Sequence, residues 1–475
     1  MSTRYPWSCA DRLRRRPEDH RRDLTASPAC GRLRRTGGRH LTGLREAVSS
    51  GPNAAEADAP LRAAERARLL LYAGLLLLLL NLAAPNGGLI SIPVLFFLKN
   101  RLHLQAHAFA EFNAWIGIPL YLSFLFGFLR DRWSPLQTGD RGHLLLFGLA
   151  TAAIYAAIAF MNPSYGLLLG GLLLATIAVL TAASAANGIF SAIGQDHLMA
   201  GQASTVLNVA SIVPTVAGTL LGGLLSEALE GLDASGAARS LFLVGAGLML
   251  AVAVFGAVGP RDLFTAHVRP ASSPLSDVWR LVRHWPAYPP FLLLLLWNFA
   301  PALGTVLQYH LSNTLHASDS QVGAFYAIYW ASYLPSVLLY GYLCQRVRLS
   351  KLLWWGTIVA VPQMLPLLVV HSPVGALVAA VPIGLVGGLA VTAYVDLAIR
   401  SCPRGLQGTM MMLAVTTTFF VAGRFGDLWG TDLYDHAGGF VTAVLATTAV
   451  YALILPALLL VPRRLASTAD GEAPA

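Results

Sequence analysis

One stretch occurs twice in this chain, and the repeat limits the folds that are available to it. The first copy runs from Leu77 to Arg132 and the second from Leu293 to Arg346. Residues that are costly inside apolar helices recur in the same order: Asn81 with Asn298, Pro85 with Pro301, His103 with His316 and Gly127 with Gly341, at offsets of 213 to 217 residues. Chance likeness of two apolar hairpins is the alternative. The repeat predicts two similar halves read in the same direction, as in transporters with parallel repeats.

The composition places most of the chain in a membrane. Apolar residues make up 55% of the sequence and charged residues only 12%, which is about half the charged share of a soluble domain. Twelve apolar segments are suited to crossing a bilayer: residues 69–98, 108–129, 143–161, 165–193, 205–226, 240–258, 290–310, 324–344, 352–370, 374–399, 409–429 and 439–461. We therefore predict an all-α integral membrane protein whose twelve transmembrane helices form two six-helix parallel repeats.

The longest connection divides the chain at the boundary between the repeats. The predicted parts are a disordered basic cytosolic tail, a six-helix half, a cytosolic central loop, a second six-helix half and a C-terminal tail: residues 1–66, 67–260, 261–288, 289–464 and 465–475. The basic tail lacks the apolar surface that a core needs; a start codon assigned too far upstream is the alternative. An apolar stripe that includes Trp279 and Trp285 predicts an amphipathic helix on the membrane surface, or an extension of segment seven.

Charge indicates the orientation and excludes one class of partner. The net charge is +9, yet the first 68 residues alone hold 15 arginines against eight acidic residues, so we expect no nucleic-acid binding. Of the Lys and Arg in the short loops, fourteen lie on the side of the tail and three on the other side. Cytoplasmic loops of membrane proteins carry the excess of positive charge. Both termini are therefore expected in the cytosol, and the protein in the cell (inner) membrane.

The loop between the second and third segments carries a motif. It reads Gly127-Phe-Leu-Arg-Asp131-Arg132 and continues to Asp140 and Arg141. This stretch resembles the G-x-L-x-D-R signature of the major facilitator superfamily, in which the acid and bases of the loop latch the two halves together on the cytosolic side. The resemblance implies a gating role for these residues; a solvated basic loop is the alternative. In the second copy Gln345 replaces the acid, so we expect an asymmetric latch.

Further stretches are similar to the folate–biopterin transporter family within that superfamily. They are Phe97-Leu98-Lys99-Asn100 with Leu102, Pro119-Leu-Tyr121 leading to Arg130-Asp131 and Ser134-Pro135, and Asp396 through Cys402-Pro403 to Gly408-Thr409. Asn100 stands where that family has an acid, and the family's arginine-rich motif is reduced here to residues 139–142. The resemblance implies a transporter fold and mechanism, with a pteridine as a candidate substrate. Asp396 is expected to be solvated or to belong to the latch.

Polar residues at membrane depth are candidates for a substrate path, because each must face protein or water. Asn81 and Asn298 lie in the middle of repeat-related segments. Asn86 follows Pro85 and precedes two glycines, where the first helix should break and free backbone groups to bind a ligand. Hydrogen bonds between helices explain the mid-helix asparagines equally well.

Four aromatic residues of segment eight share one helix face: Tyr326, Tyr329, Trp330 and Tyr333. They span about 10 Å along the axis at the rise of a helix, which is deeper than the headgroup zone. The stripe predicts a wall for a flat aromatic or amphiphilic ligand, with Tyr326, Tyr329 and Trp330 as binding residues. An interfacial belt or core packing is the alternative.

Three ionisable residues lie toward the outer half of the membrane: Glu111 in segment two, and Arg424 and Asp427 in segment eleven. Glu111 and Arg424 come from opposite halves and lie at compatible depth. A carboxylate–guanidinium pair that closes the outside is therefore predicted. A local pair of Arg424 with Asp427 is the alternative.

These features predict a secondary active transporter that moves a small organic solute, such as a pteridine, a folate-like compound or another flat amphiphilic metabolite, by alternating access. The sequence has no G-x-x-x-x-G-K-[ST] phosphate loop, so ATP is not expected as the energy source. No cofactor or metal is expected; a proton is a candidate coupling ion, and the expected state is a monomer in the lipid bilayer. Three alternatives remain: an exporter of drugs or unrelated metabolites, a membrane enzyme such as an acyl- or glycosyltransferase, which needs convergent catalytic groups, and a receptor or scaffold.

Overall fold

Every regular element in the described part of the chain is a helix, as the apolar segments predict. The computed structural model describes residues 62–103, 106–229, 231–260 and 274–472. Most of the predicted basic tail and residues 261–273 of the predicted central loop lie outside the described residues. Helix α2 begins at Ala63, so the last residues assigned to the tail belong to the first helix.

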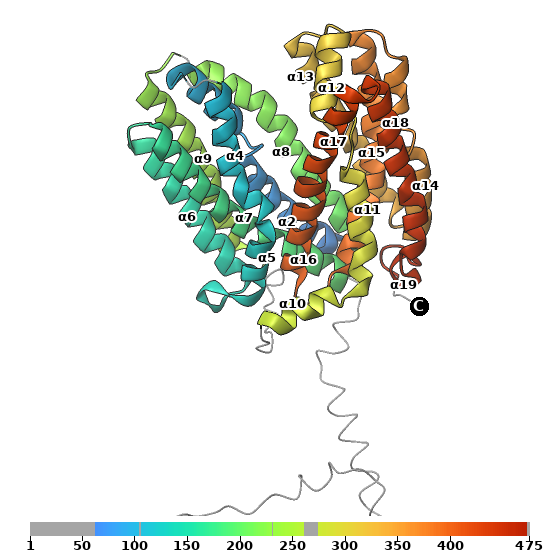
Figure 1. Cartoon of the computed structure of the whole chain (residues 1–475). Coiled ribbons are helices and arrows are strands. Elements are labelled where there is room, and N and C mark those ends of the chain that lie inside the picture. The colour runs from blue at the N-terminus through green and yellow to red at the C-terminus, as the bar shows by residue number, and fades with distance from the viewer. Residues whose placement is uncertain (1–61, 104–105, 230, 261–273, 473–475) are drawn as a thin grey trace, which may run out of the picture. The chain divides into compact units, whose positions relative to one another are not determined.

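The described helices fall into two groups joined by a short linker helix (Figure 1). The first group contains α2 (Ala63–Ala83), α3 (Ser91–Phe96), α4 (Ala106–Tyr121), α5 (Ser123–Arg132), α6 (Asp140–Phe160), α7 (Tyr165–Asp196), α8 (Ala200–Leu229) and α9 (Ala234–Val258). The linker helix is α10 (Pro274–Val282). The second group contains α11 (Tyr288–Asn298), α12 (Thr305–Tyr309), α13 (Asp319–Leu343), α14 (Leu349–Ala360), α15 (Pro373–Ser401), α16 (Gln407–Ala414), α17 (Gly423–His436), α18 (Gly439–Ala457) and α19 (Arg463–Ala466).

Eleven helical spans among the described residues are long and apolar enough to cross a membrane. They match eleven of the twelve predicted segments; the segment expected at 290–310 is absent from this set. Its two helices, α11 and α12, are separated by Phe299–Gly304, where Pro301 lacks an N–H donor and Gly304 has a φ of +65°. The seventh segment is therefore a broken helix.

The two copies of the repeat fold alike. Gly87, in the break that follows α2, has a φ of +79°, and Gly304, in the break that follows α11, has a φ of +65°. A short helix and then a π-helical turn follow each break: Phe97–Arg101 in the first copy and His310–Thr314 in the second. His103 and His316 end these stretches with positive φ values of 51° and 54°. Left-handed backbone is rare for a non-glycine residue, so its recurrence at repeat-related positions reflects a shared local structure.

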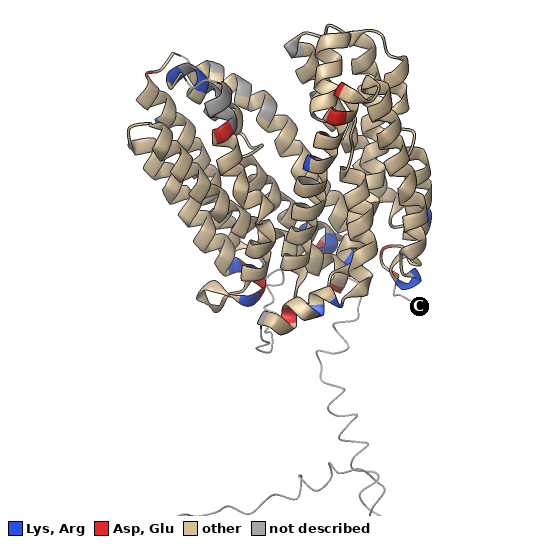
Figure 2. Ribbon diagram, in the orientation of Figure 1, with Lys and Arg blue, Asp and Glu red and all other residues tan. Residues whose placement is uncertain are grey.

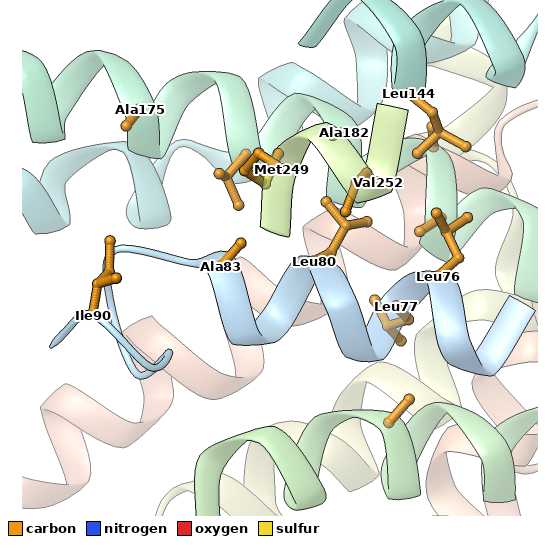
Figure 3. Packing of buried hydrophobic residues seen from close by; sticks show 14 of the residues in the cluster. Leu76, Leu77, Leu80, Ala83, Ile90, Leu144, Ala175, Ala182, Met249 and Val252 are labelled. Atoms are coloured by element: carbon orange, nitrogen blue, oxygen red, sulfur yellow. The ribbon is translucent and has the colours of Figure 1, made fainter. Parts of the chain in front are cut away.

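Helix α2 lies at the centre of the first half. Leu76 and Leu80 of α2 are each 1% exposed and pack with Leu144 of α6, Met249 of α9 and other buried residues in one cluster (Figure 3). Truncating such a buried leucine to alanine costs about 2–5 kcal/mol. In the second half the corresponding helix, α11, packs against α15 and α18, and Trp297 stacks on Tyr451 with ring centroids 4.9 Å apart.

The halves meet along several helix pairs. Helix α5 packs against α16, and α8 packs against α13 and α15. Many Lys and Arg residues gather at one end of the helices, which we call the arginine-rich end (Figure 2). Arg130 and Arg132 close α5, Arg346 follows α13, Arg400 lies in the last turn of α15 and Arg463 begins α19.

Candidate functional site

Asp131 joins the two halves at the arginine-rich end. One of its carboxylate oxygens accepts a hydrogen bond from the backbone N–H of Gly408 at 3.2 Å. The other accepts from the N–H and the hydroxyl of Thr409, at 2.7 and 2.6 Å. These N–H groups belong to the first turn of α16, where donors lack partners within the helix and the helix dipole favours a negative charge. The side chain of Asp131 is fully buried, so this contact is sealed from water.

Arg130 holds two carboxylates together beneath this contact. Its Nη1 donates to Asp131 at 2.7 Å, and its Nε and Nη2 donate to the two oxygens of Asp140 at 2.5 Å each. A bidentate guanidinium–carboxylate pair fixes orientation as well as charge. The sequence motif singled out Asp131 and Asp140, but Arg130, at one of its variable positions, was missed as their partner.

The two helices of this contact approach closely because Gly127 has no side chain. A Cβ added at Gly127 would lie 2.5 Å from the carbonyl oxygen of Gly408. Such a separation is too short for any Cβ contact, so another residue would force α5 and α16 apart. The glycine thus determines how near Asp131 comes to the start of α16.

Arg132 connects the first half to the linker helix. Its Nη1 donates to Asp277 of α10 at 2.9 Å. On the other side of α10, Arg280 donates to the carbonyl oxygen of Arg404, and a ring nitrogen of His284 lies 2.8 Å from the carbonyl oxygen of Ser401. The linker therefore touches both halves at the arginine-rich end. Arg141, the remaining predicted gating residue, is half-buried in the first turn of α6.

A second buried ionic cluster lies in the second half. Asp396 accepts from Arg400 Nε at 2.7 Å and from the hydroxyl of Tyr340 at 2.6 Å. Asp396 is fully buried, so the expectation that it is solvated is wrong. Arg400 also donates to Asp470 at 2.9 Å. Sequence reasoning missed Arg400 and Asp470, because nothing local to either residue marks a partner about 70 residues away.

Other polar side chains connect the halves near this end. The hydroxyls of Ser123 and Thr416 are 2.5 Å apart, and Gln195 donates to the carbonyl oxygens of Ile399 and Cys402 at 2.9 and 2.6 Å. These hydrogen bonds between the halves extend from Asp131 and Gln195 at the arginine-rich end to Ser123 at the other end of α5.

The predicted asparagines have different environments. Asn81 donates to the carbonyl oxygen of Ala210 on α8 at 3.0 Å, whereas Asn298 donates to Leu294 of its own helix at 2.8 Å. The buried Nδ2 of Asn86 has no hydrogen-bond partner among the described residues. An unsatisfied buried donor in a native structure calls for an explanation, and Asn86 lies in the helix break that the sequence singled out.

The aromatic stripe of α13 is partly internal. Tyr329 and Tyr333 are buried, and their hydroxyls lie 2.8 Å apart. Tyr326 donates to the carbonyl oxygen of Gly304 in the break between α11 and α12, at 3.0 Å. Trp330 is half-buried, with its ring centroid 5.2 Å from that of Tyr329. Tyr326 and Trp330 are thus the accessible members of the stripe, and Tyr326 joins it to the broken helix.

Toward the opposite end, the predicted gating residues contact their own halves. Asp427 accepts from the N–H and hydroxyl of Thr305, at 2.8 and 2.9 Å, and from Arg424 Nη1 at 3.4 Å. Glu111 accepts from the ring N–H of Trp115 at 3.5 Å. Arg424 therefore forms the local pair with Asp427 in this conformation, and its side chain remains 59% exposed. Among the ion pairs of the described residues, none joins Glu111 to Arg424.

Comparison with known proteins gives the same architecture. A family model described as Major Facilitator Superfamily matches residues 76–426. No curated protein matches the chain. Several solved structures match most of this chain and nearly all of their own chain, at low sequence identity.

The E. coli fucose:proton symporter FucP is 17% identical, with 83% of this chain and 98% of FucP covered and a TM-score of 0.61. The proton:xylose symporter XylE is 13% identical, with 87% and 99% covered and a TM-score of 0.62. A bacterial homologue of the iron transporter ferroportin, in its outward-facing state, is 17% identical, with 82% and 98% covered and a TM-score of 0.60.

The family model begins within α2 and covers the break that follows it, the motif that contains Asp131, the rest of the first group of helices, and the second group as far as the first turn of α17. Proteins of this group are multi-pass membrane transporters rather than enzymes and bind small-molecule substrates. The chain belongs to the major facilitator superfamily.

Proposed function

We propose that this protein is a secondary transporter that moves a small organic solute by alternating access between its two halves. The observation that carries the proposal is the placement of the contacts between the halves. Asp131, Ser123 and Gln195 bond across the interface at and near the arginine-rich end, whereas Arg424 and Glu111 bond within their own halves. Halves that are bonded to each other at one end and not at the other correspond to one conformation of an alternating-access cycle.

The positive-inside rule assigns the arginine-rich end to the cytosol, so the proposed conformation is closed toward the cytosol. The same rule favours cytosolic termini. We place the protein in the cell (inner) membrane as part of the proposal, and the duplicated six-helix halves suit a monomer as the transporting unit. In the opposite conformation, Glu111 and Arg424 would form the outer gate. Their present local contacts are weak, at 3.5 and 3.4 Å, and are readily exchanged.

We further propose that the substrate binds beside the two broken helices. Asn86 presents an unsatisfied amide in the first break, and Tyr326 touches Gly304 in the second. Asn81 lies on α2 before the first break, Asn298 ends α11 before the second, and Tyr329 and Trp330 share α13 with Tyr326. An amide donor and aromatic rings fit a flat solute with hydrogen-bonding edges, such as a pteridine or folate-like compound.

A second candidate substrate is a sugar moved with a proton, since FucP and XylE are named as proton symporters for fucose and xylose. Glu111 is the carboxylate best suited to coupling, because it is exposed near the outer end of α4 and has one weak hydrogen bond, to Trp115, among the described residues. Export of drugs or unrelated metabolites would use the same architecture in the opposite direction.

Transport by purified protein in proteoliposomes tests the proposal. Labelled folates, pterins, fucose, xylose and unrelated metabolites would be offered with and without an imposed proton gradient. Saturable uptake of one class, weakened by Tyr326→Ala or Trp330→Ala in folded protein, is the expected result. If every offered class enters at the rate of empty vesicles in both directions of the gradient, the proposed substrate classes are wrong.

A further inference from the structure

The second half lacks the acid that latches the first half. Asp131 stands four residues after Gly127, and the residue four after Gly341 is Gln345. Gln345 is exposed, and its Nε2 donates to the carbonyl oxygen of Gly341 in its own chain segment, at 2.9 Å. The repeat-related position therefore offers no carboxylate to the first half.

The start of α8 is nevertheless capped by a carboxylate from the second half. Asp470 accepts from the backbone N–H of Gly201 at 3.1 Å and of Gln202 at 2.9 Å. Gly201 and Gln202 are the second and third residues of α8, just as Gly408 and Thr409 are the second and third residues of α16. The side chain of Asp470 is 1% exposed.

The surroundings of the two acids also correspond. Arg130 bridges Asp131 and Asp140, while Arg400 bridges Asp470 and Asp396 at 2.9 and 2.7 Å. Close helix approach occurs at both places. A Cβ added at Gly201 would lie 2.6 Å from the Cβ of Cys344, the residue that follows α13, so α8 also packs too closely there for a side chain.

The segment that follows α19 carries Asp470 into this position and is fixed to both halves. Two of its bonds are to the second half. The N–H of Leu349 donates to the carbonyl oxygen of Thr468 at 3.3 Å, and the N–H of Asp470 donates to the carbonyl oxygen of Cys344 at 2.9 Å. On the first half, the N–H of Gly471 donates to the carbonyl oxygen of Leu198 at 2.7 Å. Residues 468–471 thus span the interface between the halves.

We propose that Asp470 is the second latch of the gate at the arginine-rich end, supplied by the segment after the last helix in place of the acid missing at Gln345. It acts as a positioning residue: it holds α8 of the first half against the ends of α13 and α15 when this end is closed. The inference rests on the proposed alternating-access function, because a latch has a role only if the halves separate.

Amide hydrogen exchange in the full-length protein tests this without knowledge of the substrate. The readout is exchange at Gly201 and Gln202, which bond Asp470, and at Gly408 and Thr409, which bond Asp131. Asp470→Asn should raise exchange at both pairs, by about fivefold for the loss of one helix cap. Exchange at the distant pair rises because both latches close the same gate. Asp131→Asn should likewise raise exchange at both pairs.

Two further variants serve as controls. Glu472→Gln removes an acid from the same segment whose carboxylate bonds the N–H of Ala469, and it should leave both amide pairs protected. Asp470→Glu keeps the carboxylate, so it should retain more protection than Asp470→Asn. Unchanged exchange in the buried part of α2 in every variant shows that the fold is intact.

The outcomes separate the latch from the transport mechanism. If Asp131→Asn affects both amide pairs but Asp470→Asn affects only Gly201 and Gln202, Asp470 is a local helix cap and the latch proposal is overturned. The same holds if Asp470→Asn affects neither pair. If Asp131→Asn also acts only locally, the halves do not separate as units, and alternating access itself fails.

Discussion

The proposed latching by Asp131 depends on both of its carboxylate oxygens being hydrogen-bond acceptors. Substitution by asparagine preserves the shape but presents an amide to the N–H groups of Gly408 and Thr409 and removes the charge that faces Arg130. Loss of one member of a buried ionic cluster typically costs about 3–5 kcal/mol. Asp140 lies in the same cluster, yet its bond to Arg130 stays within the first half.

We therefore predict that Asp131→Asn and Asp140→Asn both lower the thermal unfolding midpoint, but that only Asp131→Asn opens the arginine-rich end. Labelling of the buried thiol of Cys402 by a membrane-impermeant reagent, applied from that side, measures the opening. Equal labelling in the two variants would show that the cluster is structural and does not gate.

Protonation of Asp470 should change the stability of the latch. Its pKa is raised to about 6, chiefly by burial and then by the neighbouring Asp396, while Arg400 and the N–H groups of Gly201 and Gln202 act in the opposite sense. The thiol of Cys344 and the hydroxyl of Tyr340 are the other titratable groups of the cluster, and α8 contributes only backbone amides.

A carboxyl group released to solvent titrates near its ordinary value of about 4, so the latched state binds a proton more tightly than the released state. Protonation of Asp470 therefore stabilises the latched state. This stabilisation is complete below about pH 4 and is lost as the pH rises through about 6. Protection of Gly201 and Gln202, corrected for intrinsic exchange, should be greater at pH 5 than at pH 7 and flat above. Asp470→Asn should remove the difference; a persistent difference would assign the titration to another group.

At the scale of helices, the gate depends on one close approach. A side chain at Gly127 collides with the backbone of Gly408, whereas a Cβ at Gly117 on the preceding helix α4 meets nothing within 4 Å. Both glycines are helical, so alanine improves the helix propensity of each by up to about 1 kcal/mol. Only the packing differs between them.

We predict that Gly127→Ala destabilises the protein and opens the arginine-rich end, while Gly117→Ala is neutral or stabilising. Thermal unfolding in detergent and labelling of Cys402 measure the two effects. Similar behaviour of the two variants would mean that α5 and α16 can shift without loss of the latch.

The sequence was most informative about these elements where the residue type carries a structural cost. Pro85, Asn86 and the two glycines that follow predicted the first helix break, and the motif from Gly127 to Arg132 predicted a contact between the halves. The seventh segment was predicted as continuous because Leu293 and its neighbours form an apolar run like any other; its division follows from Pro301 and Gly304. Asp470 had no local signal, since its partners are brought together only by the packing of α8, α13 and α15.

For the whole molecule, the proposed alternating-access mechanism requires the halves to part at the arginine-rich end in every cycle. Ser123 of α5 and Thr416, in the π-helical turn that follows α16, face each other across the interface with hydroxyls 2.5 Å apart. Cysteines at these positions are close enough for a disulfide, which needs Cβ atoms about 4 Å apart.

Oxidation of the Ser123→Cys, Thr416→Cys double variant should therefore stop transport, and reduction should restore it. Ser123→Cys alone, under the same oxidant, controls for effects of the oxidant and of the native cysteines. A fully cross-linked protein that still transports at the rate of its reduced form would exclude separation of the halves at this level.

The position of residues 468–471 has a practical consequence for work with this protein. Gly471 is hydrogen-bonded to the first half. A linker of four residues reaches only about 14 Å when fully extended, so an affinity tag or fluorescent protein fused within four residues of Gly471 would be tethered directly against the gate. Such a fusion would pull on the segment that carries Asp470 and bias the equilibrium under study. Purification handles and reporters therefore belong at the N-terminal side.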